Sequence, residues 1–206
     1  MCDMKLMLNF RFLPGTVGIV TTLCLIARCL ISIFVADSAF SDAANTVLAI
    51  VSMTIAIHLI RSTAGMLNKH VWESVSLILL LLIPVFNLLT TTYNILFDSL
   101  AFMNSQWFTV ILLALSFPAF FSYFFFFVYK KFANDKRMKA VIALSAVAGA
   151  VYVIPRLLSV FSVSAEPIAF LAGNSYVSLV IYVIELICFI ISGFVFRGYA
   201  RRESAK

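Results

Sequence analysis

The stretch AVIALSAVAGAVYVIPRLLSVF, residues 140–161, decides the fold class of this chain. It exceeds the roughly 20 apolar residues that a helix needs to cross a bilayer. It also carries Arg156, directly after Pro155. A charge near the middle of such a helix costs about 2.5–3.5 kcal/mol on insertion scales, so it normally faces the interior of a bundle. The stretch therefore predicts a membrane-spanning helix with one polar face turned inward.

The composition extends this prediction to the whole chain. Of the 206 residues, 63% are hydrophobic and only 12% are charged, whereas soluble domains are about 45–50% apolar and about 25% charged. We therefore expect an all-α, polytopic integral membrane protein whose residues 1–206 form a single membrane domain. The hydrophobic segments predict a six-helix transmembrane bundle, with helices at about 15–36, 41–61, 74–97, 107–129, 138–162 and 175–196.

Three of these segments contain a proline, at Pro84, Pro118 and Pro155. In a membrane bundle, neighbouring helices can satisfy the carbonyls that a proline frees. We expect these prolines to kink their helices rather than end them.

The first segment follows a basic start, as a secretory signal peptide would. Its apolar run is longer than a typical signal core and has Arg28 in its second half. A retained helix is therefore the favoured interpretation.

The distribution of charge predicts the orientation. The two tails and the second and fourth links hold thirteen of the fifteen Lys and Arg residues, all except Arg28 and Arg156. The other links carry Asp37, Asp42, Asp98 and Glu166 instead. By the positive-inside rule, we expect a multi-pass protein of the cell membrane with both termini in the cytoplasm.

A faint internal repeat accompanies this alternation. The segments IARCLISIF and VIPRLLSVF align around Arg28 and Arg156. Weak symmetry of this kind is common in transporters, and it would make the bundle three repeated helical hairpins. Apolar sequence of low complexity also produces such matches, so both interpretations stay open.

Polar residues recur at helical spacing in three of the segments. Residues three, four and seven apart share a helix face. The stripes are Gly18, Thr21, Cys24, Arg28 and Ser32; Ser145, Gly149, Tyr152, Arg156 and Ser159; and Ser178, Tyr182, Glu185 and Ser192. Glu185 is the only acid well inside a segment, so a pair between Arg156 and Glu185 is expected.

These stripes predict a polar site in the non-cytoplasmic half of the bundle. Arginines at its floor would attract an anionic or zwitterionic small solute. The leading hypothesis is a small multi-pass transporter, or the substrate-binding or membrane subunit of one. The candidate substrate-binding residues are Arg28, Asn87, Asn94, Tyr152, Arg156, Tyr182 and Glu185.

The alternative is a non-transporting membrane protein, such as an assembly, immunity or signalling partner. Small and hydroxylated residues also line ordinary helix contacts in membranes. Ala146, Gly149 and Ala150 would let another membrane subunit approach closely. On either hypothesis, the lipid bilayer is the principal partner.

Other function classes have little support. None of the GxSxG, HExxH, P-loop or GxGxxG motifs occurs, so we expect no enzyme and no cofactor. The four cysteines form no CxxC pair, and only two histidines are present, so no metal site is expected. Lys and Arg lie in short clusters between apolar runs rather than on one face, which argues against nucleic-acid binding.

One further stretch, FFSYFFFFVYKK at residues 120–131, is unusually aromatic. It is interpreted as a lipid-facing patch beside basic residues that anchor at the headgroups.

Overall fold

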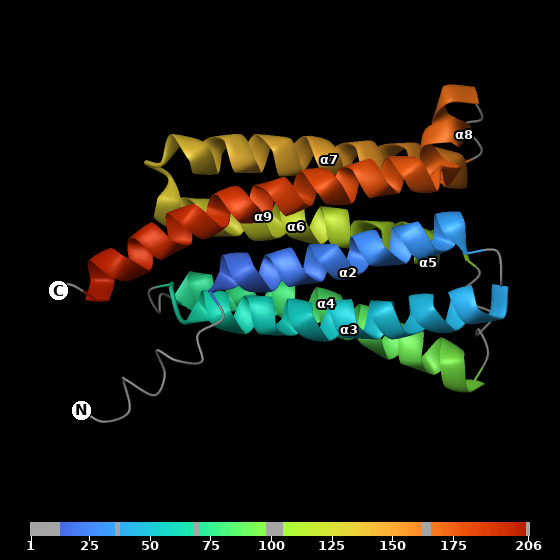
Figure 1. Cartoon of the computed structure of the whole chain (residues 1–206), viewed down its shortest axis with the longest axis horizontal. Coiled ribbons are helices and arrows are strands. Elements are labelled where there is room, and N and C mark those ends of the chain that lie inside the picture. Colours follow the sequence, from blue (N-terminus) through green and yellow to red (C-terminus); the bar gives the residue numbers. More distant parts are fainter. Residues whose placement is uncertain (1–12, 36–37, 68–70, 98–104, 162–165, 205–206) are drawn as a thin grey trace.

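The computed structural model describes residues 13–35, 38–67, 71–97, 105–161 and 166–204, and all the regular secondary structure in these ranges is helical (Figure 1). Within the helices, the side chains of 38, 72, 94–97, 129 and 203–204 are not described. The helices are α2 (Pro14–Phe34), α3 (Ser38–Ala64), α4 (Val71–Phe97), α5 (Gln106–Ala114), α6 (Phe117–Phe132), α7 (Lys136–Val160), α8 (Glu166–Gly173) and α9 (Ser175–Ser204).

Five of these helices are long and apolar enough to cross a membrane. The count becomes six if α5 and α6, which meet at a bend of 43°, are taken as one span. The all-helical class is thus confirmed, and the apolar helices are compatible with a multi-pass membrane protein. Insertion in a membrane and the count of six helices stay predictions. The hairpin repeat stays a prediction, as does the division into a single domain.

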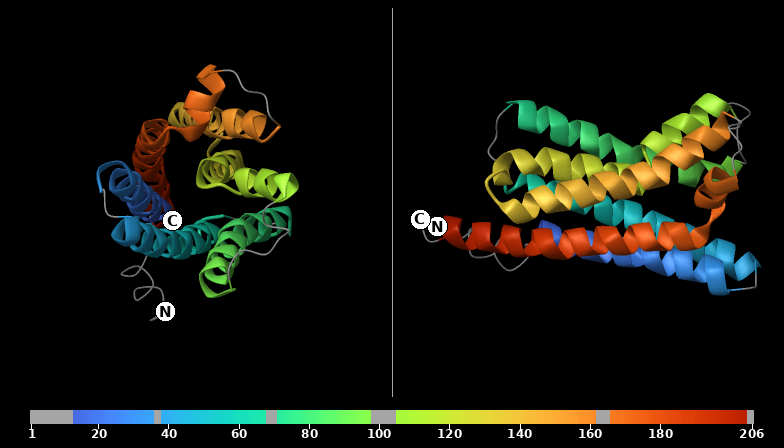
Figure 2. Two further views of the ribbon diagram at one scale, coloured as in Figure 1. Left: turned by 90° about the vertical axis from the view of Figure 1, so that its right-hand side faces the viewer. Right: turned by 90° about the horizontal axis from the view of Figure 1, so that it is seen from above.

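The helices surround a common axis (Figure 2). α2 packs between α3 and α9, α7 packs between α6 and α9, and α4 packs on α3. We call the end where α2 begins and α9 ends the basal end, and the opposite end, beside α8, the distal end (Figure 1). Toward the distal end, α4 slopes away from α7 (Figure 1).

The helix predicted at 107–129 is in fact two helices. The chain ends α5 at Ala114 and starts α6 at Phe117, with Pro118 in the first turn of α6. That position is favourable because the missing proline N–H would have no partner there anyway. The prediction was therefore wrong at Pro118, whereas α4 and α7 continue through Pro84 and Pro155.

Two other boundaries differ from the prediction. The link at 163–174 contains a short helix, α8, which packs against α7. The last helix continues to Ser204 rather than to about residue 196. Arg201 and Arg202 lie in its last turn, where a positive charge interacts favourably with the helix dipole.

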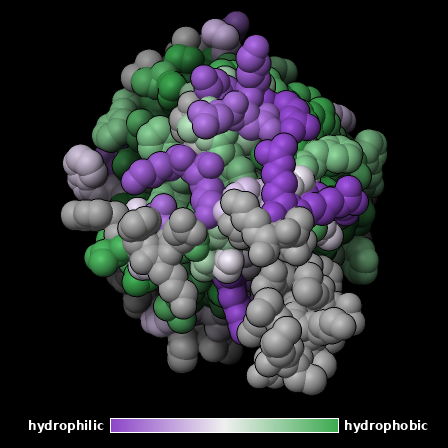
Figure 3. All heavy atoms as spheres, turned by 90° about the vertical axis from the view of Figure 1, so that its left-hand side faces the viewer, coloured by the Kyte–Doolittle hydropathy of each residue, from purple (hydrophilic) through white to green (hydrophobic). Residues whose placement is uncertain are grey.

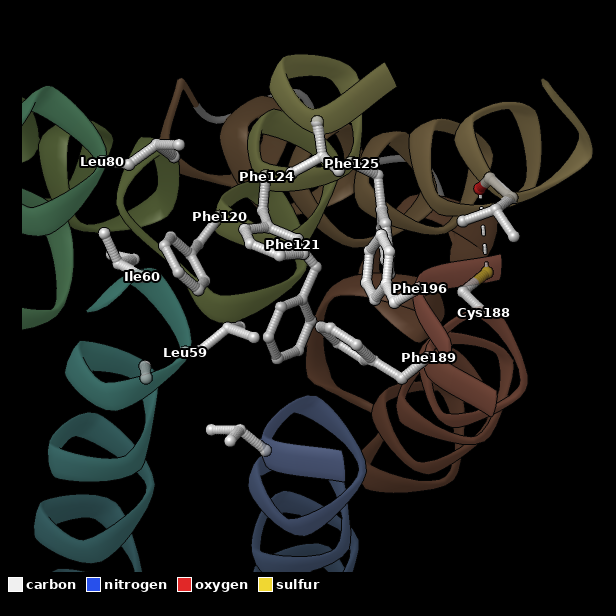
Figure 4. Packing of buried hydrophobic residues seen from close by; sticks show 14 of the residues in the cluster. Leu59, Ile60, Leu80, Phe120, Phe121, Phe124, Phe125, Cys188, Phe189 and Phe196 are labelled. Carbon is white, nitrogen blue, oxygen red and sulfur yellow. Dashed lines mark hydrogen bonds between the residues drawn. The ribbon is translucent and has the colours of Figure 1, made fainter. Parts of the chain in front are cut away.

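One face of the aromatic stretch of α6 is buried, so the interpretation of the whole stretch as a lipid-facing patch was wrong. Phe121 and Phe125 pack on Phe189 of α9, with ring centroids 5.0 and 4.8 Å apart (Figure 4). Phe120 is only 1% exposed, whereas Phe126 is 72% exposed. We call the buried set the phenylalanine core; it consists of Phe120, Phe121, Phe124, Phe125, Phe189 and Phe196.

Burial is concentrated toward the basal end. On α2, the buried residues run from Pro14 to Leu25, and the last nine residues of the helix have none. Hydrophilic residues gather on the basal end face, with hydrophobic residues around them (Figure 3). Its exposed basic side chains are Arg61, Lys130, Lys136, Arg137, Lys139, Arg197, Arg201 and Arg202.

The turn into α7 is fixed by Asp135, which caps the helix by accepting a hydrogen bond from the Arg137 backbone N–H at 2.9 Å. The Arg137 guanidinium also donates to this carboxylate, with Nη2–Oδ2 2.8 Å. These hydrogen bonds hold the pKa of Asp135 below its ordinary value.

The crossing of α2 and α9 depends on glycine. A Cβ at Gly15 would collide with the Gly193 Cα. We expect Gly15→Ala to lower the free energy of unfolding by about 1–3 kcal/mol, because the helices must separate. Gly198→Ala is the control, because no atom lies within 4 Å of the added Cβ. Thermal unfolding in detergent measures both; a Gly15→Ala variant as stable as the parent would contradict this packing.

Candidate functional site

Arg156 is held by hydroxyl, carbonyl and aromatic groups. Its Nη1 donates to the Tyr152 carbonyl and its Nη2 to Ser178 Oγ, both at 3.0 Å. Its guanidinium carbon lies 3.8 Å from the centroid of the Tyr152 ring. These contacts orient the charged group without neutralising it.

Glu185 lies deeper and has a different partner. Its side chain is 0% exposed. The Ser145 hydroxyl lies 2.8 Å from one carboxyl oxygen and 3.0 Å from the other. The predicted pair between Arg156 and Glu185 was therefore wrong.

The helix register explains this difference. α7 and α9 pack so that Arg156 is level with Ser178, seven residues from Glu185 along α9. Seven residues correspond to roughly 10 Å of helix rise. Each charged group thus hydrogen-bonds to the serine at its own level.

Two tyrosines lie between these levels. The rings of Tyr152 and Tyr182 have centroids 6.5 Å apart, and Tyr182 is buried. From the distal end inward, the contacts between α7 and α9 are therefore Arg156 with Ser178, Tyr152 with Tyr182, and Ser145 with Glu185. The predicted polar stripes of these two helices do face each other.

Arg28 belongs to the same region. Both Arg28 and Arg156 lie close enough to Tyr182 and Cys29 to interact with them electrostatically. Within the part of the chain that the structure describes, the only ion pair joins Arg137 and Asp135. The two arginines therefore share one region without a described carboxylate to balance them.

The position of Arg28 on α2 indicates what it faces. Arg28 lies seven residues after Thr21 and three after Leu25, so the three residues share one face of α2. Toward the basal end, this face is buried. Arg28 itself is exposed, as is Ser32 on the same face. Ser159 repeats this pattern on α7. The faces of α2 and α7 that are buried in the basal half of the bundle are thus exposed in its distal half.

The two predicted asparagines do not join this cluster. Asn87 donates through Nδ2 to the Leu115 carbonyl at 2.8 Å and to the Ile83 carbonyl at 3.0 Å. It therefore satisfies a carbonyl freed where α5 ends, and we assign it a structural role. The side chain of Asn94 lies outside the described residues.

The three residues of α7 that were predicted to contact another subunit, Ala146, Gly149 and Ala150, differ in their surroundings. Gly149 is used within the chain, because a Cβ there would lie 2.5 Å from Ser122 Oγ and 3.1 Å from the Pro118 carbonyl oxygen of α6. Ala146 and Ala150 are exposed.

Among the described residues, no group of three His, Cys, Asp or Glu side chains could hold a metal ion. Cys24, Cys29 and Cys188 are free thiols.

Three residues near the site were not among the predicted site residues: Ser145, Ser178 and Cys29. Ser145 and Ser178 lay on the predicted stripes, so their hydroxyl groups at helical spacing from Arg156 and Glu185 were the available signal. The sequence carried no signal for Cys29, because a cysteine in an apolar helix is usually a packing residue.

Comparisons with known proteins add no assignment: no family model matches the chain, and neither a curated protein nor a solved structure is similar to it.

The role of Asn87 is testable. We expect Asn87→Leu to lower the free energy of unfolding by about 1–3 kcal/mol, because the partly buried Leu115 carbonyl loses its donor. Thr92→Val, which removes an exposed hydrogen bond within α4, should change stability by no more than about 0.5 kcal/mol. Thermal unfolding of the two variants makes the comparison. Equal stability of Asn87→Leu and the parent would show that the carbonyl does not need this amide.

Proposed function

We propose that the chain is a small membrane transporter, or the solute-binding membrane subunit of one, that binds an anionic or zwitterionic solute. The observation that supports this most is that Arg28 and Arg156 share one accessible region without a described carboxylate partner. Tyr152 and Tyr182 would form the wall of the site beside them.

The chemistry of arginine suits such a solute. A guanidinium binds carboxylate or phosphate through two parallel N–H donors. Arg156 is already oriented by Ser178 and the Tyr152 ring, which reduces the conformational entropy that binding would cost. An anion would also offset the cost of keeping two positive charges inside the bundle.

The charge distribution supports an outward-facing site. Basic residues crowd the basal end (Figure 3), whereas Asp42 and Glu166 lie toward the distal end. By the positive-inside rule, the basal end and both termini would lie in the cytoplasm of a cell-membrane protein. The distal half, where the arginines lie, would then open to the outside.

The phenylalanine core would complete an outward-open arrangement. Phe189 and Phe196 follow Glu185 toward the basal end of α9, and phenylalanines of α6 pack against Phe189 (Figure 4). The core would thus close the axis of the bundle on the basal side of Glu185. Transport by alternating access would require this core to separate while the distal half closes, with the solute site between them.

Ligand-dependent stability tests the site. The parent, Arg28→Gln and Arg156→Gln are purified, and their thermal unfolding is followed with inorganic phosphate, succinate or glutamate. A solute that binds only the folded state stabilises it by about 2.7 kcal/mol at a hundredfold excess over its Kd. We expect at least one of these probes to stabilise the parent and to lose this effect in both variants.

Arg61→Gln serves as the control, because Arg61 is exposed near the basal end and should keep the full ligand effect. Loss of the effect in all three variants would indicate non-specific charge screening. If no anion stabilises the parent, and both site variants lose folding stability alike, the arginines are helix contacts and the non-transporting alternative is favoured.

A further inference from the structure

We propose that Glu185 and Ser145 form a proton-binding site in the interior of the bundle, where Glu185 takes up and releases a proton. This inference goes beyond solute binding and does not require it. It rests on the hydrogen-bond geometry of the pair, on the groups around it and on its position in the bundle.

The geometry fits a carboxyl group that carries its proton. Ser145 Oγ lies 2.8 Å from one carboxyl oxygen and 3.0 Å from the other. A hydroxyl has one proton to donate. Both contacts become full hydrogen bonds when the hydroxyl donates to one oxygen and accepts from the protonated second oxygen. An ionised carboxylate would leave one buried oxygen with at most a shared donor.

No described cation compensates a negative charge at Glu185. The titratable groups next to Glu185 on α9 are Tyr182 and Cys188. Tyr152 and Arg156 of α7, and Arg28 and Cys29 of α2, lie around Tyr182. Arg156 hydrogen-bonds at the level of Ser178, and the described ion pairs do not include Arg28. α6 presents phenylalanines to this part of α9.

The position of the pair favours proton exchange toward the distal side. On the basal side, Cys188 Sγ donates to the Val141 carbonyl at 3.7 Å, and the phenylalanine core follows (Figure 4). On the distal side, Tyr182 lies three residues from Glu185, next to Tyr152. The two tyrosine rings thus lie between the level of Glu185 and that of Arg156.

The test is infrared spectroscopy of the purified protein in lipid membranes at neutral pH. We expect the C=O stretch of a protonated carboxyl group in the parent. This band should disappear in Glu185→Gln, which keeps the shape and hydrogen-bonding capacity of the acid. Glu73→Gln is the matched control, because Glu73 lies in the first turn of α4, and it should keep the band.

Two further measurements test the proposal without changing Glu185. In Ser145→Ala the band should move to higher frequency, because the carboxyl loses its hydrogen-bond partner. Transfer of the parent to D2O should shift the band, because the proton exchanges. A Glu185-dependent carboxylate band instead of the acid band would overturn the proposal, and so would an acid band that D2O leaves unchanged. Neither result depends on whether the arginines bind an anion.

Discussion

A charged side chain inside a membrane bundle must replace the water that it loses. For an arginine at the helix centre, the cost is about 2.5–3.5 kcal/mol on insertion scales. Here Arg156 uses a serine, a backbone carbonyl and the face of Tyr152, and Glu185 uses Ser145 alone. The two groups lie on adjacent helices but at separate levels. This separation underlies both proposals, because direct pairing would neutralise the arginines and hold the carboxylate in its ionised form.

The packing of the bundle produces that separation. Toward the basal end, glycines bring α2 against α9, and the phenylalanine core fills the axis. Toward the distal end, the same helix faces carry polar residues and are accessible. On α2, burial ends at Leu25, and Arg28 follows on the exposed part of the helix. Along the axis, the residues change from aromatic to polar, and the helix faces change from buried to exposed.

Hydropathy and period predicted much of this arrangement. They identified the apolar helices within a few residues, except for the break before Pro118 and the C-terminal end of α9. They also placed Ser145, Tyr152 and Arg156 on one face and Ser178, Tyr182 and Glu185 on another. The register between the two helices was not predictable, because a depth counted from a predicted helix end is uncertain by about 2–4 residues, or roughly one turn. That uncertainty produced the incorrect pairing of Arg156 with Glu185.

The other errors also have physical reasons. Lipid is as apolar as a protein core, so a run of phenylalanines fits either environment, and the stretch at 120–131 gave no signal that α6 is central. The break before Pro118 depends on Asn87 of another helix, which satisfies the Leu115 carbonyl. A contact between residues so far apart in sequence leaves no local pattern.

The central claim is that the inner helix faces are open to water in the distal half and closed in the basal half. Labelling of single cysteines, introduced into a cysteine-free variant in sealed membranes, tests it most directly. A membrane-impermeant maleimide applied from outside should label Arg28→Cys and Ser159→Cys. It should not label Thr21→Cys, which lies on the closed part of the same face, or Leu30→Cys, which lies on the opposite, exposed apolar face of α2. Equal protection of positions 28, 159 and 21 from the outside would contradict the claim.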